Sequence, residues 1–194
     1  MTSAQTTKTA LITGSATGIG EVVARYLAQE GYRLILVDIN AESNRRLAAE
    51  LSLAEIFTVD LANRPQLEAL CQRIAELDLD LAFINAGITR MGDVSFMSEK
   101  IIDLQIELNL RSAIVLNKAC GEAMRQRRKG HIISTVSAAG LVAMKYNAVY
   151  SATKFGLRGF LMAYRLEMQR YNVHISGLYP AAVDTPLLRD EAVV

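Results

Sequence analysis

Histidine and cysteine are scarce in this sequence, which contains two of each among its 194 residues. Cys71 and Cys120 fall in separate helical patterns without metal-ligand spacing, so we expect two buried free thiols. His131 and His174 lie inside strand-like runs, and we interpret both as structural residues. So small a supply of ligands and bases argues against a histidine-based metal site or a catalytic triad, and we expect no bound metal.

An excess of charge of one sign is missing as well. The 21 basic and 20 acidic residues leave a net charge of +1, which gives no indication of a nucleic-acid partner. The basic cluster at 125–129 ends a helical pattern just before Gly130. We interpret it as the cationic end of a helix rather than as a binding patch.

Long apolar runs are also absent. No run approaches the roughly 20 residues that span a bilayer, and residues 1–8 lack the apolar stretch of a signal peptide. We therefore expect a cytoplasmic protein without membrane contact. Repeats, low-complexity segments and linkers are missing too, so residues 1–194 are expected to form a single domain.

The sequence does contain a regular alternation of short apolar runs and amphipathic segments. This alternation predicts an α/β fold, a Rossmann-like doubly wound parallel sheet of six strands with helices on both faces. The expected strands are residues 10–12, 33–38, 55–59, 80–84, 131–136 and 173–179, and the expected helices are 22–28, 41–51, 64–77, 99–128 and 148–171.

The turn from Thr13 to Gly20, between the first strand and the first helix, carries glycines in the spacing G-x-x-x-G-x-G. We expect Gly14 to permit the tight turn and Gly18 to let the backbone approach a pyrophosphate. Gly20 would let the helix pack closely on the strand. Alone, three glycines in a loop are equally compatible with plain turn chemistry.

Asp38 ends the second strand, 18 residues after Gly20. An acidic residue about 20 residues beyond such a loop meets the ribose 2′-OH of a dinucleotide, so Asp38 favours NAD over NADP, whose 2′-phosphate it would repel. The alternative is that Asp38 caps the helix beginning near Ala41. Asp60 follows the third strand and Asn85-Ala86-Gly87 the fourth, at the strand ends where ligands of open α/β sheets bind.

Tyr150 and Lys154 are four residues apart in a helical segment, so they project from one helix face. A nearby ammonium stabilises a phenolate by about 1.4 kcal/mol per pKa unit, and we expect Lys154 to lower the pKa of Tyr150 in this way. Ser137 follows the fifth strand and is placed to polarise the carbonyl that the tyrosine protonates.

Together these motifs resemble the classical short-chain dehydrogenase/reductase family, and the resemblance extends over the whole chain. It implies that Tyr150 is the general acid/base and that Ser137 orients the substrate oxygen. It further implies that Lys154 binds the nicotinamide ribose and that Asn109 holds a water for proton relay. The implied cofactor contacts are Gly14, Ser15, Thr17, Gly18, Ile19, Gly20, Asp38, Asp60, Leu61, Asn85, Ala86, Gly87, Tyr150, Lys154, Pro180, Val183 and Thr185, and the implied substrate contacts are Ser137, Ala139, Met144 and Tyr150.

The sequence departs from the family pattern in two places. Ala181 replaces the glycine of a Pro-Gly-x-Val-x-Thr segment, and if that position needs a positive φ, alanine costs roughly 1 kcal/mol. The family pattern also continues beyond Val194 through a helical lid, another helix and a seventh strand. We therefore expect a sheet without that strand and a site without that lid.

The leading interpretation is an NAD-dependent oxidoreductase that moves a hydride between nicotinamide and an alcohol or ketone carbon. Further pocket candidates are Leu141, Tyr146 and Asn147, with the loop after Asn85. One alternative is a non-catalytic NAD-binding protein that uses the same fold for sensing or interaction. Another, a purely structural domain, leaves the motifs unexplained.

A stripe of small residues, Ala152, Gly156, Gly159 and Ala163, recurs at helical spacing in the segment that carries Tyr150. In the resembling family the two long helices, here 99–128 and 148–171, pair with their copies across a two-fold axis. We therefore expect a homodimer through these helices. The alternative is that the stripe packs against this chain's own sheet. The sixth strand is expected to be an unpaired apolar edge.

Overall fold

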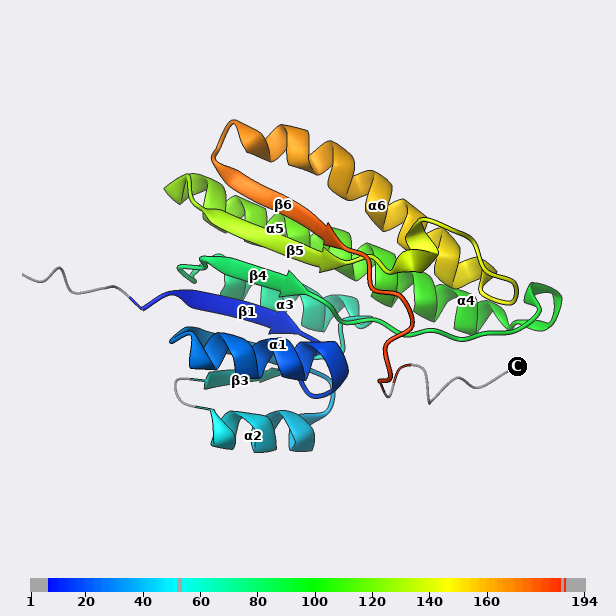
Figure 1. The fold of residues 1–194 in the computed structure, drawn as a ribbon, viewed down its shortest axis with the longest axis horizontal. Coiled ribbons are helices and arrows are strands. Elements are labelled where there is room, and N and C mark those ends of the chain that lie inside the picture. The colour runs from blue at the N-terminus through cyan, green and yellow to red at the C-terminus, as the bar shows by residue number, and fades with distance from the viewer. Residues whose placement is uncertain (1–6, 52–53, 186, 188–194) are drawn as a thin grey trace, which may run out of the picture.

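The computed structural model describes residues 7–51, 54–185 and 187, and a single parallel sheet lies at its centre (Figure 1). The order of the strands is β3-β2-β1-β4-β5-β6, and all neighbouring pairs are parallel. The six-stranded Rossmann-like fold predicted from the sequence is confirmed. The strands are β1 (Thr9–Thr13), β2 (Arg33–Asp38), β3 (Ala54–Thr58), β4 (Leu81–Ile84), β5 (Gly130–Thr135) and β6 (Val173–Leu178).

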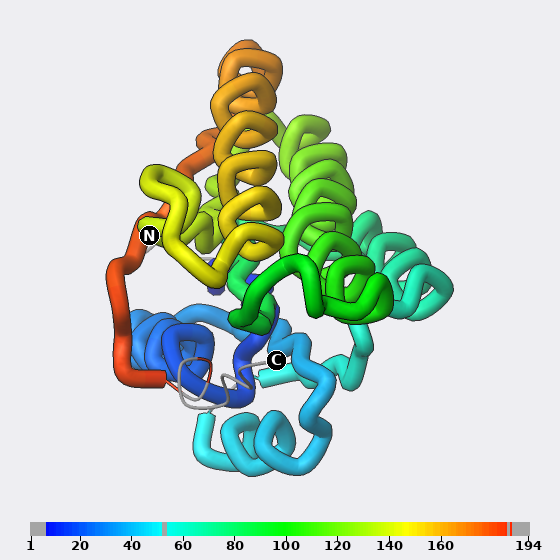
Figure 2. The backbone as a smooth tube through the Cα atoms, turned by 90° about the vertical axis from the view of Figure 1, so that its right-hand side faces the viewer, coloured from blue at the N-terminus to red at the C-terminus, as the bar shows by residue number. Residues whose placement is uncertain are grey.

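Helices cover both faces of the sheet. The α-helices are α1 (Gly18–Gln29), α2 (Ala41–Glu50), α3 (Arg64–Ile74), α4 (Glu99–Ile106), α5 (Ser112–Arg127) and α6 (Ala148–Gln169). Figure 2 shows α1 and α2 on one side and α3, α5 and α6 on the other. Each side has its own buried apolar cluster: Leu27 and Leu47 belong to the first, and Leu67, Leu116 and Leu161 to the second. Burial on both faces explains why the inner strands are continuous apolar runs.

The strand order changes direction between β1 and β4. The chain builds outward from β1 to β2 and β3, and then crosses back to place β4 on the other side of β1. In open α/β sheets the crevice at such a switch point, at the carboxyl ends of the strands, is where ligands bind. The segment after β6 runs across these strand ends towards α1 (Figure 1).

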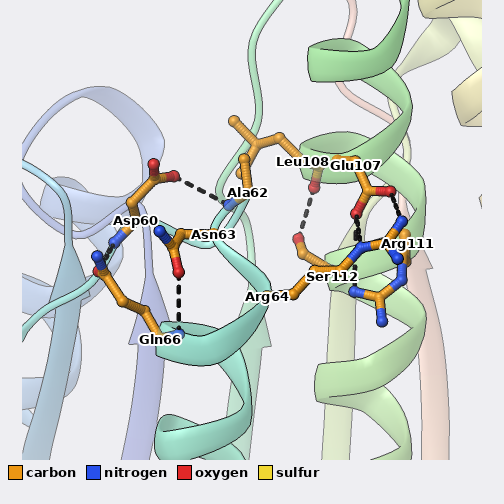
Figure 3. Close-up of polar contacts among 9 residues, drawn as sticks. All are labelled: Asp60, Ala62, Asn63, Arg64, Gln66, Glu107, Leu108, Arg111 and Ser112. Carbon is orange, nitrogen blue, oxygen red and sulfur yellow. Dashed lines mark hydrogen bonds and ion pairs between the residues drawn. The ribbon is translucent and has the colours of Figure 1, made fainter.

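The helical stretch expected over residues 99–128 is present from Glu99 to Arg127, but its middle is not α-helical. A π-helical turn, η2 (Glu107–Arg111), separates α4 from α5. The Ser112 hydroxyl donates to the Leu108 carbonyl across 2.6 Å inside this turn. Arg64, at the start of α3, forms a two-pronged ion pair with Glu107, which also faces Arg111 (Figure 3). The wide turn is therefore fixed to α3 at the position where the chain carries Asn109.

β6 is an edge strand: it pairs with β5 on one side, and no other described strand lies beside it. Val173 and Ile175 point into the core, while His174 and Leu178 on the opposite face are exposed. The expectation of an apolar edge therefore holds for only one face of this strand. Among the described helices, none is both long and apolar enough to cross a membrane.

Candidate active site

A cavity of about 720 Å³ opens at the carboxyl ends of the strands. This volume lies within the range of roughly 300–1,000 Å³ that is typical of small-molecule and cofactor sites. Four of the predicted site residues, Ser15, Gly20, Asn109 and Ala139, do not line it. Those that line it are Gly14, Thr17, Gly18, Ile19, Asp38, Asp60, Leu61, Asn85, Ala86, Gly87, Ser137, Met144, Tyr150, Lys154, Pro180, Val183 and Thr185.

The glycine-rich loop after β1 has the geometry that its spacing predicts. Gly14 and Gly18 have φ values of +65° and +59°, a region that side-chain-bearing residues rarely adopt. A Cβ at Gly14 would lie 3.0 Å from the Ala86 Cα, so a side chain there would collide with the loop after β4. Gly20 is packed on the loop itself and not on the strand, because its Cβ would overlap the Gly14 carbonyl.

Ser15, predicted as a cofactor contact, does not line the cavity. It is fully buried, and its hydroxyl donates to the Asn44 Oδ1 across 2.8 Å. The Asn44 amide donates in turn to the Leu36 carbonyl. Ser15 therefore fastens the glycine-rich loop to α2 and β2, and its side chain points away from the cavity.

Asp38 faces the glycine-rich loop from the end of β2. Its Oδ2 accepts from the Ala16 N–H and its Oδ1 from the Asn40 N–H, both across 2.9 Å. The alternative that Asp38 caps α2 is wrong, because Asn40 is the N-cap and accepts from the Ser43 N–H. Asp38 lines the cavity, and each of its oxygens retains an unused lone pair.

Asp60 occupies the matching position after β3. Its Oδ1 accepts from the Ala62 N–H across 2.9 Å, and its own N–H donates to Gln66 Oε1 (Figure 3). Asn63 caps α3 by accepting from the Gln66 N–H. Asp60 is thus held at the cavity wall by a turn that the start of α3 stabilises.

Asn85, directly after β4, connects the strands on either side. Its Nδ2 donates to the Thr13 carbonyl across 3.3 Å, and its Oδ1 accepts from the Thr135 hydroxyl across 3.0 Å. The Thr13 hydroxyl accepts from the N–H groups of Asn85 and Ala86. The Asn85 side chain is therefore used within the protein, where it joins the ends of β1, β4 and β5.

Ser137, Tyr150 and Lys154 converge on one wall of the cavity. The Lys154 Nζ donates to the Thr135 carbonyl across 2.9 Å and lies 5.5 Å from the centre of the Tyr150 ring. Burial lowers the pKa of Lys154 to about 8. Burial also raises the pKa of Tyr150, whereas a hydrogen bond with Ser137 lowers it by a smaller amount. Burial is the larger of these two causes, and the effect of Lys154 on the pKa of Tyr150 stays a prediction.

Ser137 adopts a strained backbone conformation, with φ +85° and ψ 154°. Such a conformation costs a non-glycine residue of order 1–3 kcal/mol and persists only where the surroundings impose it. Here the Ser137 hydroxyl accepts from the Ala139 N–H, and its own N–H donates to the Leu178 carbonyl. Ser137 is thereby positioned between β5 and β6 with its hydroxyl directed to Tyr150.

Asn109 lies behind the cavity in the π-turn η2 and is fully buried. Its side chain accepts from the Ile88 N–H and donates to the Ile88 carbonyl, both across 2.8 Å. A Cβ on Gly87 would lie 3.0 Å from the Asn109 Oδ1, so this glycine lets the two segments meet. The side chain thus orders the loop after β4.

The loops that contain the predicted substrate contacts differ from the prediction in detail. Ala139, predicted as a substrate contact, is fully buried, and Ala138 lines the cavity in its place. Leu141 and Tyr146 are exposed outside the lining, whereas Asn147 belongs to it. The strain considered for Ala181 is absent, because its φ is not positive. The loop after Asn85, which the sequence offered as a pocket candidate, contributes Thr89 and Met91 to the lining. Lining residues that sequence reasoning missed include Leu108, Thr135 and Lys145, none of which belongs to a recognisable motif.

A family model described as short chain dehydrogenase matches residues 8–192. The chain belongs to the short-chain dehydrogenase family. Nodulation protein G of Rhizobium sp. (strain N33) is 33% identical over 186 residues, which are 94% of this chain and 76% of that protein. Nicotinamide-dependent hydride transfer is general for this family, so this short-chain dehydrogenase is a member of an oxidoreductase family.

Solved structures of short-chain dehydrogenases superpose closely on this one. The short-chain dehydrogenase from Sphingobium yanoikuyae, in complex with NADPH, gives a TM-score of 0.92 at 26% identity. The match covers 96% of this chain and 75% of the Sphingobium chain. A 3-ketoacyl-(acyl-carrier-protein) reductase from Brucella melitensis, complexed with NADH, gives a TM-score of 0.88 at 23% identity. The match covers 95% of this chain and 79% of the reductase, and at this identity it shows the fold alone. Both forms of the cofactor therefore occur among the neighbours of this short-chain dehydrogenase.

Proposed function

We propose that this short-chain dehydrogenase uses NAD(H) to transfer a hydride to or from an alcohol or ketone carbon, with Tyr150 as the general acid/base. The observation that carries the proposal is the convergence of Tyr150, Ser137 and Lys154 on a cavity that also contains the glycine-rich loop. A structural domain without ligands would not require a strained serine and a lysine that is only 3% exposed to line the same cavity.

The residues of the cavity fit a dinucleotide. Gly14 and Gly18 leave room for phosphate at the start of α1, where unpaired N–H groups and the helix dipole favour an anion. Asp38 would accept the adenosine ribose hydroxyls, and Asp60 and Leu61 line the wall beside it. Lys154 and the segment of Pro180, Val183 and Thr185 would hold the other end. The nicotinamide, when bound, supplies or accepts the hydride.

The preference for NAD over NADP is proposed on the charge at Asp38. The carboxylate is held by two backbone N–H groups and keeps capacity to accept from ribose hydroxyls. A 2′-phosphate at the same place would meet that negative charge, and none of the basic residues that the structure describes lines the cavity near the end of β2. Some structural neighbours hold NADPH, so the preference has to be measured for this chain.

The roles of the catalytic side chains follow from their contacts. Tyr150 would donate its proton to the carbonyl oxygen during reduction and recover it during oxidation. Ser137, hydrogen-bonded with Tyr150, would orient the same oxygen. Lys154 donates one of its three N–H groups to Thr135, which leaves two for a ribose. A water held at Asn109 would bind its backbone, because its side chain is engaged with Ile88.

The test is a screen of ketones and alcohols that follows NADH absorbance, with Tyr150→Phe as the decisive variant. Phenylalanine keeps the ring but removes the transferable proton, so turnover should be lost while NADH binding is retained. Tyr26→Phe, at an exposed position on α1, is the matched control and should leave both unchanged. A Tyr150→Phe enzyme with wild-type turnover would rule out the proposed acid/base role.

We further propose that the protein is a homodimer through α4, α5 and α6. The alternative that the small-residue stripe packs on the chain's own sheet is wrong, because Ala152, Gly156, Gly159 and Ala163 are all exposed. Large apolar side chains surround the stripe: Met162 is 61% and Leu166 is 73% exposed. A two-fold contact would bury this face. The cytoplasmic location remains a prediction.

A further inference from the structure

Among the described residues, the lining of the cavity near Tyr150 includes basic side chains and no carboxylate. Lys145 lines the cavity between Met144 and Asn147, on the segment that leads into α6. Among the described residues it has no ion-pair partner, and its Nζ lies 4.7 Å from the centre of the Tyr146 ring. In the part of the chain that the structure describes, the carboxylates that line the cavity are Asp38 and Asp60, at the ends of β2 and β3 in the other half of the sheet.

Asn147 adds an unused polar group beside this lysine. The residue is only 5% exposed, and its Oδ1 accepts from the Thr89 hydroxyl across 3.0 Å. Its Nδ2 donates to no described residue. Among the described residues, the Ser151 hydroxyl is the one fully buried side-chain group without a hydrogen-bond partner. The Asn147 Nδ2 is therefore not fully buried, and solvent can reach it. Since Asn147 lines the cavity, the amide N–H groups are available to an acceptor bound there.

The start of α6 favours the same kind of ligand. Asn147 is the N-cap of this 22-residue helix, and its side chain makes no capping hydrogen bond. The first turn contains no acidic residue, so the N–H groups and the positive end of the helix dipole are uncompensated. Tyr150 lies in that first turn, and its side chain lines the same cavity as Lys145 and Asn147.

We infer that the substrate of this dehydrogenase carries an anionic group, a carboxylate or a phosphate, near the carbon that exchanges the hydride. Lys145 and the Asn147 amide receive this group, and the first turn of α6 stabilises it. The inference rests on the proposed function, since it takes Tyr150 as the end of the cavity where the substrate reacts. It makes Lys145 a specificity-determining residue.

The experiment compares pairs of probes of which one member carries an anionic group and the other does not: acetoacetate with its neutral methyl ester, and dihydroxyacetone phosphate with dihydroxyacetone. Binding to the protein–NADH complex is measured by calorimetry, and turnover is followed by NADH absorbance. The wild type should bind the anionic member of at least one pair more tightly than the neutral member. A preference within the acetoacetate pair identifies a carboxylate as the anionic group, and a preference within the dihydroxyacetone pair identifies a phosphate.

Lys145→Met should weaken binding of the favoured anion about tenfold, through KM more than kcat, and leave its neutral partner unchanged. Asn147→Asp keeps the acceptor for Thr89 but puts a negative charge at the amide, and it should also weaken the anion selectively. The matched control is Lys8→Met, which removes the same charge from a lysine 5.7 Å from the centre of the Tyr32 ring, at the opposite end of the strands.

Equal binding of anionic and neutral probes by the wild type would overturn the inference, as would a loss in Lys8→Met equal to that in Lys145→Met. Failure of the proposed function gives a different result. In that case the anion binds to the NADH complex in a Lys145-dependent manner, but no member of either pair is turned over.

Discussion

The choice between NADH and NADPH rests on Asp38, and its removal offers a quantitative test. Two unit charges about 4 Å apart interact by about 1 kcal/mol in water and about 4 kcal/mol at an effective dielectric constant of 20. Asp38 is half-buried, between these limits, and a 2′-phosphate would carry at least one negative charge. The carboxylate should therefore disfavour NADPH by about tenfold or more, since about 1.4 kcal/mol corresponds to a factor of ten.

Asp38→Ala removes this repulsion and also leaves the Ala16 N–H free to donate to a phosphate. NADH should bind more weakly, because hydrogen bonds to a charged group contribute about 1.5–3 kcal/mol. The ratio of the two dissociation constants should therefore move towards NADPH by about tenfold or more. Fluorescence titration of both cofactors measures it.

Asp60→Ala is the matched control for this substitution. It removes the same charge from the end of the neighbouring strand β3, where we expect it to affect both cofactors alike. Tighter binding of NADPH than of NADH by the wild type would refute the reasoning. So would a change of the ratio in Asp60→Ala as large as that in Asp38→Ala.

Three further predictions concern stability, pH and assembly. Gly20→Ala should lower the free energy of unfolding by roughly 1–3 kcal/mol and weaken NADH binding, because the new methyl group meets the Gly14 backbone; unchanged chemical denaturation would contradict this. Burial raises the pKa of Tyr150, so the phenol is protonated at neutral pH. The rate of alcohol oxidation, which needs the phenolate, should therefore rise about tenfold per pH unit, whereas the rate of carbonyl reduction should not. Parallel pH profiles for the two directions would argue against this role of Tyr150. Gly159→Arg should convert a dimer into a monomer by light scattering without unfolding it, since nothing lies within 4 Å of a Cβ there; a monomeric wild type would exclude the helix interface.

The architecture could be predicted from the sequence because each element has a simple local signal. The buried strands are short apolar runs, and the helices are amphipathic segments between them, so their alternation indicates a parallel sheet. The order of the strands then places Gly14, Asp38 and Asn85 at one end of the sheet. Helix ends were less accurate: α3 ends at Ile74, whereas the pattern extended to residue 77.

The details that sequence reasoning missed depend on backbone geometry. The π-turn at 107–111 adds one residue to a turn without altering the amphipathic pattern on either side, so the pattern predicts one long helix. Ser137 has a positive φ, which a serine in a sequence does not indicate, and Ala138 rather than Ala139 lines the cavity directly after it. Ser15 has the position of a phosphate contact in the motif, but its hydroxyl is used by Asn44.

The central claim is that a hydride passes directly between the nicotinamide and a substrate carbon under the control of Tyr150. NADH that carries deuterium at both C4 positions of the nicotinamide, followed by mass spectrometry of the alcohol produced from a ketone, measures this transfer. The wild type should place the label on the carbinol carbon, and Tyr150→Phe should form no labelled alcohol although it binds NADH. A wild-type protein that binds labelled NADH but delivers no deuterium to any ketone or oxo acid of the panel would contradict the account.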